Sequence, residues 1–223
     1  MRPLLLGHRG ARASRHVPEN TLASFELCLQ HGCDGFEFDV RRSADGVAVI
    51  CHDPAIAGLK IEYSAAKALG LPTLEQVLQK FSSRAFLDIE LKVVGLEKLL
   101  IAALRRHPLQ KGYVVSSFLP EALSAVHSLD ASIPLGLLRE IEGRAPRPAR
   151  RAGAHVFPSE APIEWAIPHL KLADRELINE VHAEGKKIMV WTVNGAGEMQ
   201  RLMEWGVDAI ISDETELLVR SVR

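Results

Sequence analysis

The chain has 223 residues and a formal net charge of −1, and 47% of its residues are apolar against 25% charged. This composition is that of a globular protein with a sizeable core, and the near-zero charge disfavours a global field that would recruit nucleic acid or an anionic membrane. Three cysteines, Cys28, Cys33 and Cys51, are too few for a disulfide framework, and without a Cys-x-x-Cys pair they disfavour structural zinc.

The first residues do not match the pattern of an export signal. Its apolar run, Leu4–Leu6, is far shorter than the core of a signal peptide, and no small-residue cleavage site follows it. No run of about 18 apolar residues occurs elsewhere, so no membrane span is predicted. These features predict a cytoplasmic protein with no stable membrane insertion and no nucleic-acid partner. The sequence leaves open whether the chain forms a homo-oligomer.

Short apolar runs rich in Val, Ile, Leu and Phe alternate with segments of helical period along the whole chain. Strands are predicted at Pro3–Gly7, Gly35–Arg41, Ala85–Lys92, Gly112–Ser117, Pro134–Leu138, His155–Pro158, Lys187–Thr192 and Asp208–Ser212. Helices are predicted at Thr21–His31, Leu74–Phe81, Leu96–His107, Pro120–Leu129, Arg175–Glu184 and Gly197–Trp205. Three of these helices are followed by a glycine, the residue that helix C-termini prefer: Gly32, Gly185 and Gly206.

Eight strand-like runs interleaved with helices predict an α/β fold, a (β/α)8 TIM-type barrel that residues 1–223 form as one domain. An open doubly wound sheet is the alternative, but Gly7-His8-Arg9-Gly10 lacks the GxGxxG spacing of a dinucleotide-binding loop. After the second strand, the turn signal Asp45-Gly46 and the apolar run Val47–Cys51 predict a short extra hairpin. We therefore expect an excursion from the barrel over about residues 43–72.

Charged residues inside the second predicted strand indicate a site within the barrel. In Phe36-Glu37-Phe38-Asp39-Val40, alternation places Glu37 and Asp39 on one face and the apolar residues on the other. The aromatic face can pack against helices. The two carboxylates must then point into the barrel, where an unpaired charge is costly.

The third predicted strand repeats this pattern, with Asp88, Glu90 and Lys92 on one face. Two inward carboxylates from one strand and at least one from another require a cation, and all-oxygen ligation suits Mg²⁺, Ca²⁺ or Mn²⁺ better than zinc. Lys92 could then bind an anion on that metal. The alternative is a buried salt-bridge network that pairs Glu37 or Asp39 with Lys92 or Arg9.

Two histidines lie where barrel enzymes place their catalytic groups. His8 ends the first predicted strand, and His52 follows the Val47–Cys51 run. Imidazoles on either side of a metal-bound phosphate could act as general base and general acid. Arg9 or Lys92 would neutralise the charge of that phosphate.

The motifs of this chain, in their order, resemble those of the glycerophosphodiester phosphodiesterases over nearly the whole sequence. The motifs are Gly7-His8-Arg9-Gly10, Pro18-Glu19-Asn20-Thr21 with Phe25, Glu37-Phe38-Asp39-Val40, Ser43-Ala44-Asp45-Gly46, His52-Asp53, Pro72-Thr73-Leu74-Glu75, Asp88-Ile89-Glu90-Leu91-Lys92, Ser116-Ser117-Phe118, Val190-Trp191-Thr192-Val193-Asn194 and Gly206-Val207-Asp208-Ala209-Ile210-Ile211-Ser212-Asp213.

The resemblance implies a distorted TIM barrel that hydrolyses glycerophosphodiesters to sn-glycerol 3-phosphate and an alcohol, in glycerol and lipid metabolism. The glycerol 2-hydroxyl would attack phosphorus, and the resulting cyclic glycerol phosphate would then be hydrolysed. The implied metal ligands are Glu37, Asp39 and Glu90, the acid–base pair is His8 and His52, and Arg9 and Lys92 contact the phosphate.

Further residues have less specific predicted roles. Trp191, at the end of the seventh strand, is expected to form an apolar wall against glycerol carbons or to belong to the core. We expect Asn20 to be a helix N-cap, Glu19 to orient a catalytic group, and Asp213 to fix the loop that closes the barrel.

One departure from the family pattern concerns the excursion. Only Asp53–Leu71 joins the second histidine to the Pro-Thr-Leu-Glu motif, and the usual Asp-Arg-Thr-Thr-like stretch is missing. The departure therefore bears on recognition of the leaving alcohol. Three rival functions remain: a lysophospholipase D or cyclising phosphodiesterase using the same site, a non-catalytic phosphate-binding barrel, and a metal-independent aldolase or isomerase.

Overall fold

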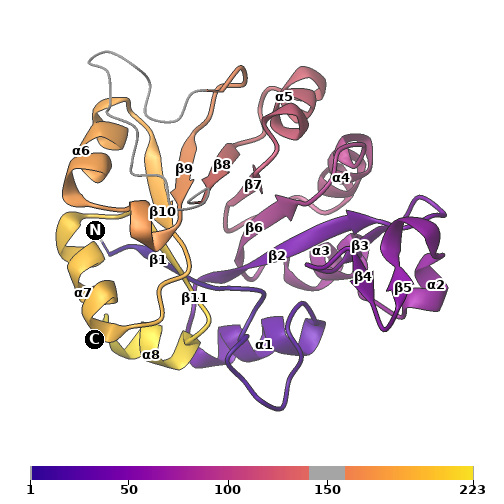
Figure 1. Cartoon of the computed structure of the whole chain (residues 1–223), viewed down its shortest axis with the longest axis horizontal. Coiled ribbons are helices and arrows are strands. Elements are labelled where there is room, and N and C mark those ends of the chain that lie inside the picture. The colour runs from indigo at the N-terminus through magenta and orange to yellow at the C-terminus, as the bar shows by residue number, and fades with distance from the viewer. Residues whose placement is uncertain (1, 141–158, 223) are drawn as a thin grey trace.

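The computed structural model describes residues 2–140 and 159–222, and these form a closed parallel barrel (Figure 1). The sheet runs in the order β1-β11-β10-β9-β8-β7-β6-β2, and pairing of β1 with β2 closes it. The predicted TIM-type barrel is confirmed. Its strands are β1 (Leu4–Gly7), β2 (Gly35–Arg42), β6 (Phe86–Leu91), β7 (Tyr113–Ser117), β8 (Leu135–Arg139), β9 (Trp165–Pro168), β10 (Lys187–Val190) and β11 (Ala209–Ser212).

Helices surround the barrel on its outer side (Figure 1). Side-chain caps fix where several begin: the Thr21 hydroxyl accepts from the Ser24 amide, Thr73 and Gln76 form a capping box, and Asp174 accepts from Leu177. The helices around the barrel are α1 (Leu22–His31), α3 (Leu74–Phe81), α4 (Glu97–Arg106), α5 (Pro120–Leu129), α6 (Arg175–Ala183), α7 (Ala196–Trp205) and α8 (Thr215–Arg220), and the 3-10 turn η2 (Leu170–Leu172) follows β9. None of the helices in the described part of the chain is long and apolar enough to cross a membrane.

The predicted excursion follows β2 and projects from one side of the barrel (Figure 1). Strand β3 (Ala48–Ile50) pairs antiparallel with β2, as the turn at Asp45-Gly46 predicts. A second small hairpin and two short helical turns complete it. These are β4 (Ala55–Ile56), β5 (Leu59–Lys60), η1 (Ile61–Tyr63) and α2 (Ala66–Leu69).

Alternation along β2 separates the main core from the inside of the barrel. Phe36 and Phe38 are fully buried on the outer face, where Phe36 stacks on Phe25 of α1 at 4.2 Å between ring centroids and packs edge-on against Phe81 of α3. Such burial contributes roughly 1.5–3 kcal/mol per side chain. It therefore holds β2 in the register that turns Glu37 inward.

An apolar layer fills the barrel interior and leaves the carboxyl ends of the strands for a site. It includes Leu6 of β1, Val114 of β7, Ile167 of β9 and Met189 of β10, all completely buried. Active sites of such barrels lie at the carboxyl ends of the strands, in the loops that follow them.

The sixth barrel strand is Trp165–Pro168. The run predicted for it, His155–Pro158, lies outside the described residues. Trp165-Ala166-Ile167 is a short apolar run bounded by a proline, a residue that usually argues against a central strand. Pro168 is tolerated because it is the last residue of β9, opposite Arg139.

Candidate active site

Three carboxylates from β2 and β6 converge inside the barrel. The parallel register sets Asp39 beside Glu90 and Glu37 beside Asp88. Oxygens of Glu37, Asp39 and Glu90 lie within 4.8 Å of one another, and all three residues are buried. Asp88 is set apart, because its Oδ1 accepts a 2.6 Å hydrogen bond from the Ser116 hydroxyl.

The electrostatics of this cluster fit a bound cation. Burial, and then the charge of Asp39, raise the pKa of Glu37 well above its usual range and that of Glu90 to about 8. Glu37 Oε1 and Asp39 Oδ1 are buried without a hydrogen-bond partner. Buried carboxylates with unused oxygens are costly unless paired, and hard divalent cations prefer this type of ligand. Glu37, Asp39 and Glu90 could therefore hold such an ion.

Two permanent cations flank the cluster. Lys92 Nζ lies 2.6 Å from Glu90 Oε1 and 3.4 Å from Asp39 Oδ1, and Arg9 Nε lies 3.3 Å from Asp39 Oδ2. Arg9 is in turn held by Glu19 at 2.8 Å, the orienting role expected of Glu19. The salt-bridge alternative is thus present in part, but it does not account for Glu37. These two side chains can also face an anion bound above the carboxylates.

His8 is held in a fixed orientation at the end of β1. Its Nδ1 donates to Asp213 Oδ1 at 2.7 Å, and its Nε2 lies 3.8 Å from Glu37 Oε2. Burial lowers the pKa of His8 although Asp213 opposes the shift, so the neutral ring is favoured. The contacts of His8, Arg12 and Asn194 hold the pKa of Asp213 well below its usual range, although burial opposes them.

Asp213 therefore does more than fix a loop. Its carboxylate accepts from the imidazole and sets which ring nitrogen faces the cluster, the arrangement that lets a histidine exchange protons. Sequence reasoning placed Asp213 at the end of the last strand but could not pair it with His8, 205 residues away along the chain.

His52 lies on the excursion, directly after β3. Its Nδ1 contacts Asp53 Oδ1 at 2.7 Å, and its backbone carbonyl accepts from Arg41 Nε at 2.8 Å. About a third of the side chain is exposed, against about a tenth for His8. The structure thus brings two histidines to the same site from different sides, one enclosed and one open to solvent.

Asn20 differs from its expected role, because Thr21 is the N-cap of α1. Asn20 is buried with a left-handed backbone, φ 56°. Its amide donates to Asp39 Oδ2 at 2.8 Å, and its amide oxygen accepts from the Asp39 backbone at 3.4 Å. The side chain therefore orients one of the clustered carboxylates. Asparagine adopts a positive φ more readily than most residues, so its presence at this position fits the left-handed backbone.

The two histidines, the two cations, Glu37 and Glu90 line one cavity of about 420 Å³. Trp191 and Phe118 form an aromatic wall, with ring centroids 5.5 Å apart. The indole N–H donates to the Ile167 carbonyl at 3.1 Å, so the ring presents its apolar surface rather than its donor. The described lining residues are His8, Arg9, Glu37, His52, Glu90, Lys92, Phe118, Leu138, Glu140, Trp191 and Ile211.

Comparison with known proteins gives consistent matches. The model of the glycerophosphoryl diester phosphodiesterase family matches residues 8–60 and 57–217. A glycerophosphodiester phosphodiesterase from Caldanaerobacter subterraneus is 30% identical over 252 aligned positions, which cover 100% of this chain and 99% of the relative. The alignment is longer than the 223-residue chain, so the relative has residues at one or more places where this chain has none.

Solved structures agree over the full length. A phosphodiesterase from Oleispira antarctica, in complex with the product sn-glycerol-3-phosphate, superposes with a TM-score of 0.83 at 25% identity, covering 99% of this chain and 97% of the other. A glycerophosphodiester phosphodiesterase from Parabacteroides distasonis gives a TM-score of 0.82 at 25% identity, covering 99% and 98%.

Proposed function

This chain belongs to the glycerophosphoryl diester phosphodiesterase family, and we propose that it hydrolyses glycerophosphodiesters to sn-glycerol 3-phosphate and an alcohol. One observation carries the proposal: two carboxylates of the buried cluster, Glu37 and Glu90, line a single cavity together with two histidines and two cations. The complex of the Oleispira antarctica phosphodiesterase with sn-glycerol-3-phosphate supports the same product.

The cluster of Glu37, Asp39 and Glu90 would hold one divalent cation, Mg²⁺ or Ca²⁺, with Mn²⁺ a further candidate. Oxygen-only ligands favour these ions, and Glu37 Oε1, which is buried without a hydrogen-bond partner, gives them an available donor. When bound, such an ion supplies positive charge against the phosphoryl oxygens and lowers the pKa of an attacking hydroxyl. Arg9 and Lys92 would contact the same phosphate from the side, as charge-assisted donors.

The two histidines divide the proton transfers. His8 would be the base for the glycerol 2-hydroxyl, because its ring is neutral at rest and Asp213 stabilises the imidazolium that forms when it accepts a proton. His52 would give a proton to the departing alcohol, since it lies at the open side where an alcohol of any size can leave. For hydrolysis of the cyclic glycerol phosphate, the two roles reverse.

The domain organisation, the small-molecule partner and the cellular location are part of the same proposal. Residues 1–223 would act as one domain, and the substrate would be the small-molecule partner. A cytoplasmic location fits Cys28, Cys33 and Cys51, which are free thiols.

Release of glycerol 3-phosphate from glycerophosphocholine and glycerophosphoethanolamine tests the proposal. The protein is assayed after chelation and again with Mg²⁺, Ca²⁺ or Mn²⁺ restored, with Glu37→Gln as a variant that keeps shape but removes charge. We expect activity that disappears with chelator, returns with metal and is absent from the variant. No release from either substrate with any metal would reject the activity, and release that persists after chelation would reject the cation.

A further inference from the structure

The cavity has two unlike sides. The β1, β2 and β6 side carries the histidines, the cations and the carboxylate cluster. The β7 to β11 side is apolar, formed by Phe118, Leu138, Trp191 and Ile211, with a single charged residue, Glu140. Among the described lining residues, Glu140 is the one carboxylate outside the metal-type cluster, and no step of the proposed function uses it.

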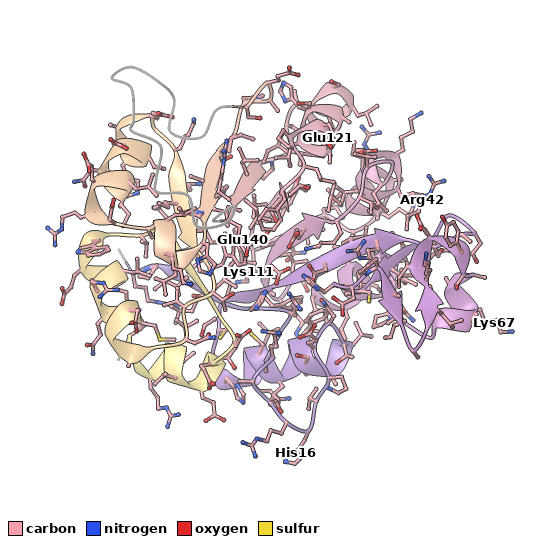
Figure 2. All side chains as sticks on the ribbon, viewed as in Figure 1. His16, Arg42, Lys67, Lys111, Glu121 and Glu140 are labelled. Atoms are coloured by element: carbon pink, nitrogen blue, oxygen red, sulfur yellow. The ribbon has the colours of Figure 1, made fainter. Side chains whose placement is uncertain are left out.

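Glu140 occupies a defined place at the cavity rim. It follows Arg139, the last residue of β8, whose carbonyl accepts from the His169 amide at 2.8 Å and so ties the strand end to the residue after β9. The side chain is exposed, and Figure 2 labels it near the middle of the view. A strand end is a rigid base from which a carboxylate can meet a substrate.

A carboxylate at this place binds hydroxyl groups or cations and repels anions. Under the proposed function the phosphate of the substrate would bind at the opposite, cationic side, so the group that reaches Glu140 would come from the organic part of the molecule. An ionised carboxylate only accepts hydrogen bonds. Its ligand must therefore be a donor.

The shape of the cavity assigns the glycerol to this side. Leu138 and Ile211 line this side and are buried, so they give it a fixed apolar surface that suits the part of the substrate that does not vary. On the His52 side, residues 53–60 are exposed and leave room for alcohols of different sizes. The fixed apolar surface of Trp191 can contact the carbon edge of glycerol while the hydroxyls point to the rim.

Resting on the proposed function, we propose that Glu140 accepts a hydrogen bond from the free sn-1 hydroxyl of the substrate glycerol and so selects deacylated glycerophosphodiesters over lysophospholipids. Acylation of that hydroxyl replaces a donor with two acceptor oxygens, which then face the acceptor oxygens of Glu140. A site that hydrogen-bonds a hydroxyl rejects analogues that lack it, and the effect is smaller where the group is exposed to water.

Turnover by Glu140→Ala and Glu140→Gln tests this selection. The substrates are glycerophosphocholine, glycerophosphoinositol and 1-acyl-lysophosphatidylcholine, and the control is Glu121→Ala, an exposed carboxylate on α5 that Figure 2 places on the outside of the barrel. Because Glu140 is exposed, we expect Glu140→Ala to lower kcat/KM about two- to tenfold on both deacylated substrates and not on the lysophospholipid. Glu140→Gln keeps one acceptor oxygen and should lose less.

Three results would overturn the inference. An equal fall on all three substrates would indicate a structural role. No fall on any of them would leave Glu140 without a role in selection. A fall on glycerophosphocholine without a fall on glycerophosphoinositol would assign Glu140 to a cationic leaving alcohol instead.

A binding arm separates this inference from the proposed activity. Calorimetric titration with glycerol 3-phosphate and with propyl phosphate, in the presence of Mg²⁺, compares ligands that differ only in the hydroxyls. If wild type turns nothing over but prefers glycerol 3-phosphate, and Glu140→Ala weakens that preference, the activity fails and the inference stands. If wild type is active and the preference is the same in both proteins, the inference alone fails. If turnover and preference are both absent from wild type, both fail.

Discussion

Replacement of Asp213 by asparagine probes how His8 is held. The Asp213 carboxylate accepts from three donors at once: His8 Nδ1 and Arg12 on one oxygen, and Arg12 and Asn194 on the other. An amide of the same shape has one oxygen and one NH₂ group. In Asp213→Asn, an NH₂ must therefore face either His8 or Asn194, two donors meeting without an acceptor.

The expected loss of activity follows from the burial of the pair formed by His8 and Asp213. Its atoms lie 2.7 Å apart, and the side chains are 11% and 15% exposed, so the screening that weakens surface ion pairs is largely absent. Hydrogen bonds to charged groups contribute about 1.5–3 kcal/mol, which corresponds to a fall of about tenfold to 150-fold in kcat/KM. Because Asp213 raises the pKa of His8, its loss should also move the acidic limb of the pH profile to lower pH.

Steady-state kinetics on glycerophosphocholine in four proteins measures this: wild type, His8→Ala, Asp213→Asn and the double variant. If Asp213 acts through His8, adding Asp213→Asn to His8→Ala should cost little more activity. A loss as large in the His8→Ala background as in wild type would refute the reasoning, as would a single variant within about threefold of wild type. Melting temperatures of all four proteins show whether the fold itself has weakened.

Other changes give separable outcomes. Because the pKa of Glu90 is raised to about 8, the metal-free protein binds more protons folded than unfolded, so its melting temperature should fall as pH rises from about 4.5 to about 8. Mg²⁺ at about 100 times its Kd should add about 2.7 kcal/mol of stability at neutral pH, and a melting temperature unchanged by any divalent ion would count against the site. Asp39→Asn should abolish both activity and the metal-induced rise, whereas His52→Ala should lose about 100-fold or more of kcat and keep the rise. Asn20→Ala should destabilise the protein by about 1–3 kcal/mol in chemical denaturation, since it removes the amide that donates to the buried Asp39 Oδ2.

Sequence patterns predicted the elements in which strand alternation or helical period matches the burial of the side chains. β2 and β6 were predicted within a residue or two because charged and apolar residues alternate along them, and α3 and α5 have the predicted bounds. β9 was missed because the prediction places this strand at the apolar run His155–Pro158, and a run of four residues, Trp165–Pro168, is too short to stand out by periodicity. α8 was not predicted, because its six residues carry too few helical turns for a periodicity to register.

The candidate site also contains residues that the sequence predicts and partners that it does not. Each predicted site residue has a local sequence signal, as a charge within a strand or as a histidine after a strand-like run. In the structure, His8, His52, Glu37 and Glu90 line one cavity, and Asp39 lies beside the two glutamates. Their roles stay predictions until activity is measured. The partners of these residues could not be read from sequence, because their roles depend on pairings formed only by barrel closure: Asp213 with His8, and Asn20 with Asp39.

The shortened excursion affects only part of this arrangement. The carboxylate cluster and Lys92 belong to β2, β6 and the residue after β6, and His8 and Arg9 follow β1, so their positions depend on the barrel alone. His52 is the one predicted site residue carried by the excursion, and Arg41 of β2 fixes its backbone through the 2.8 Å hydrogen bond. Changes in residues 53–71 should therefore alter which alcohols are released while leaving cation binding and recognition of the glycerol intact. Under this reasoning, selection at the Glu140 side and selection of the leaving alcohol are independent properties of opposite sides of one cavity.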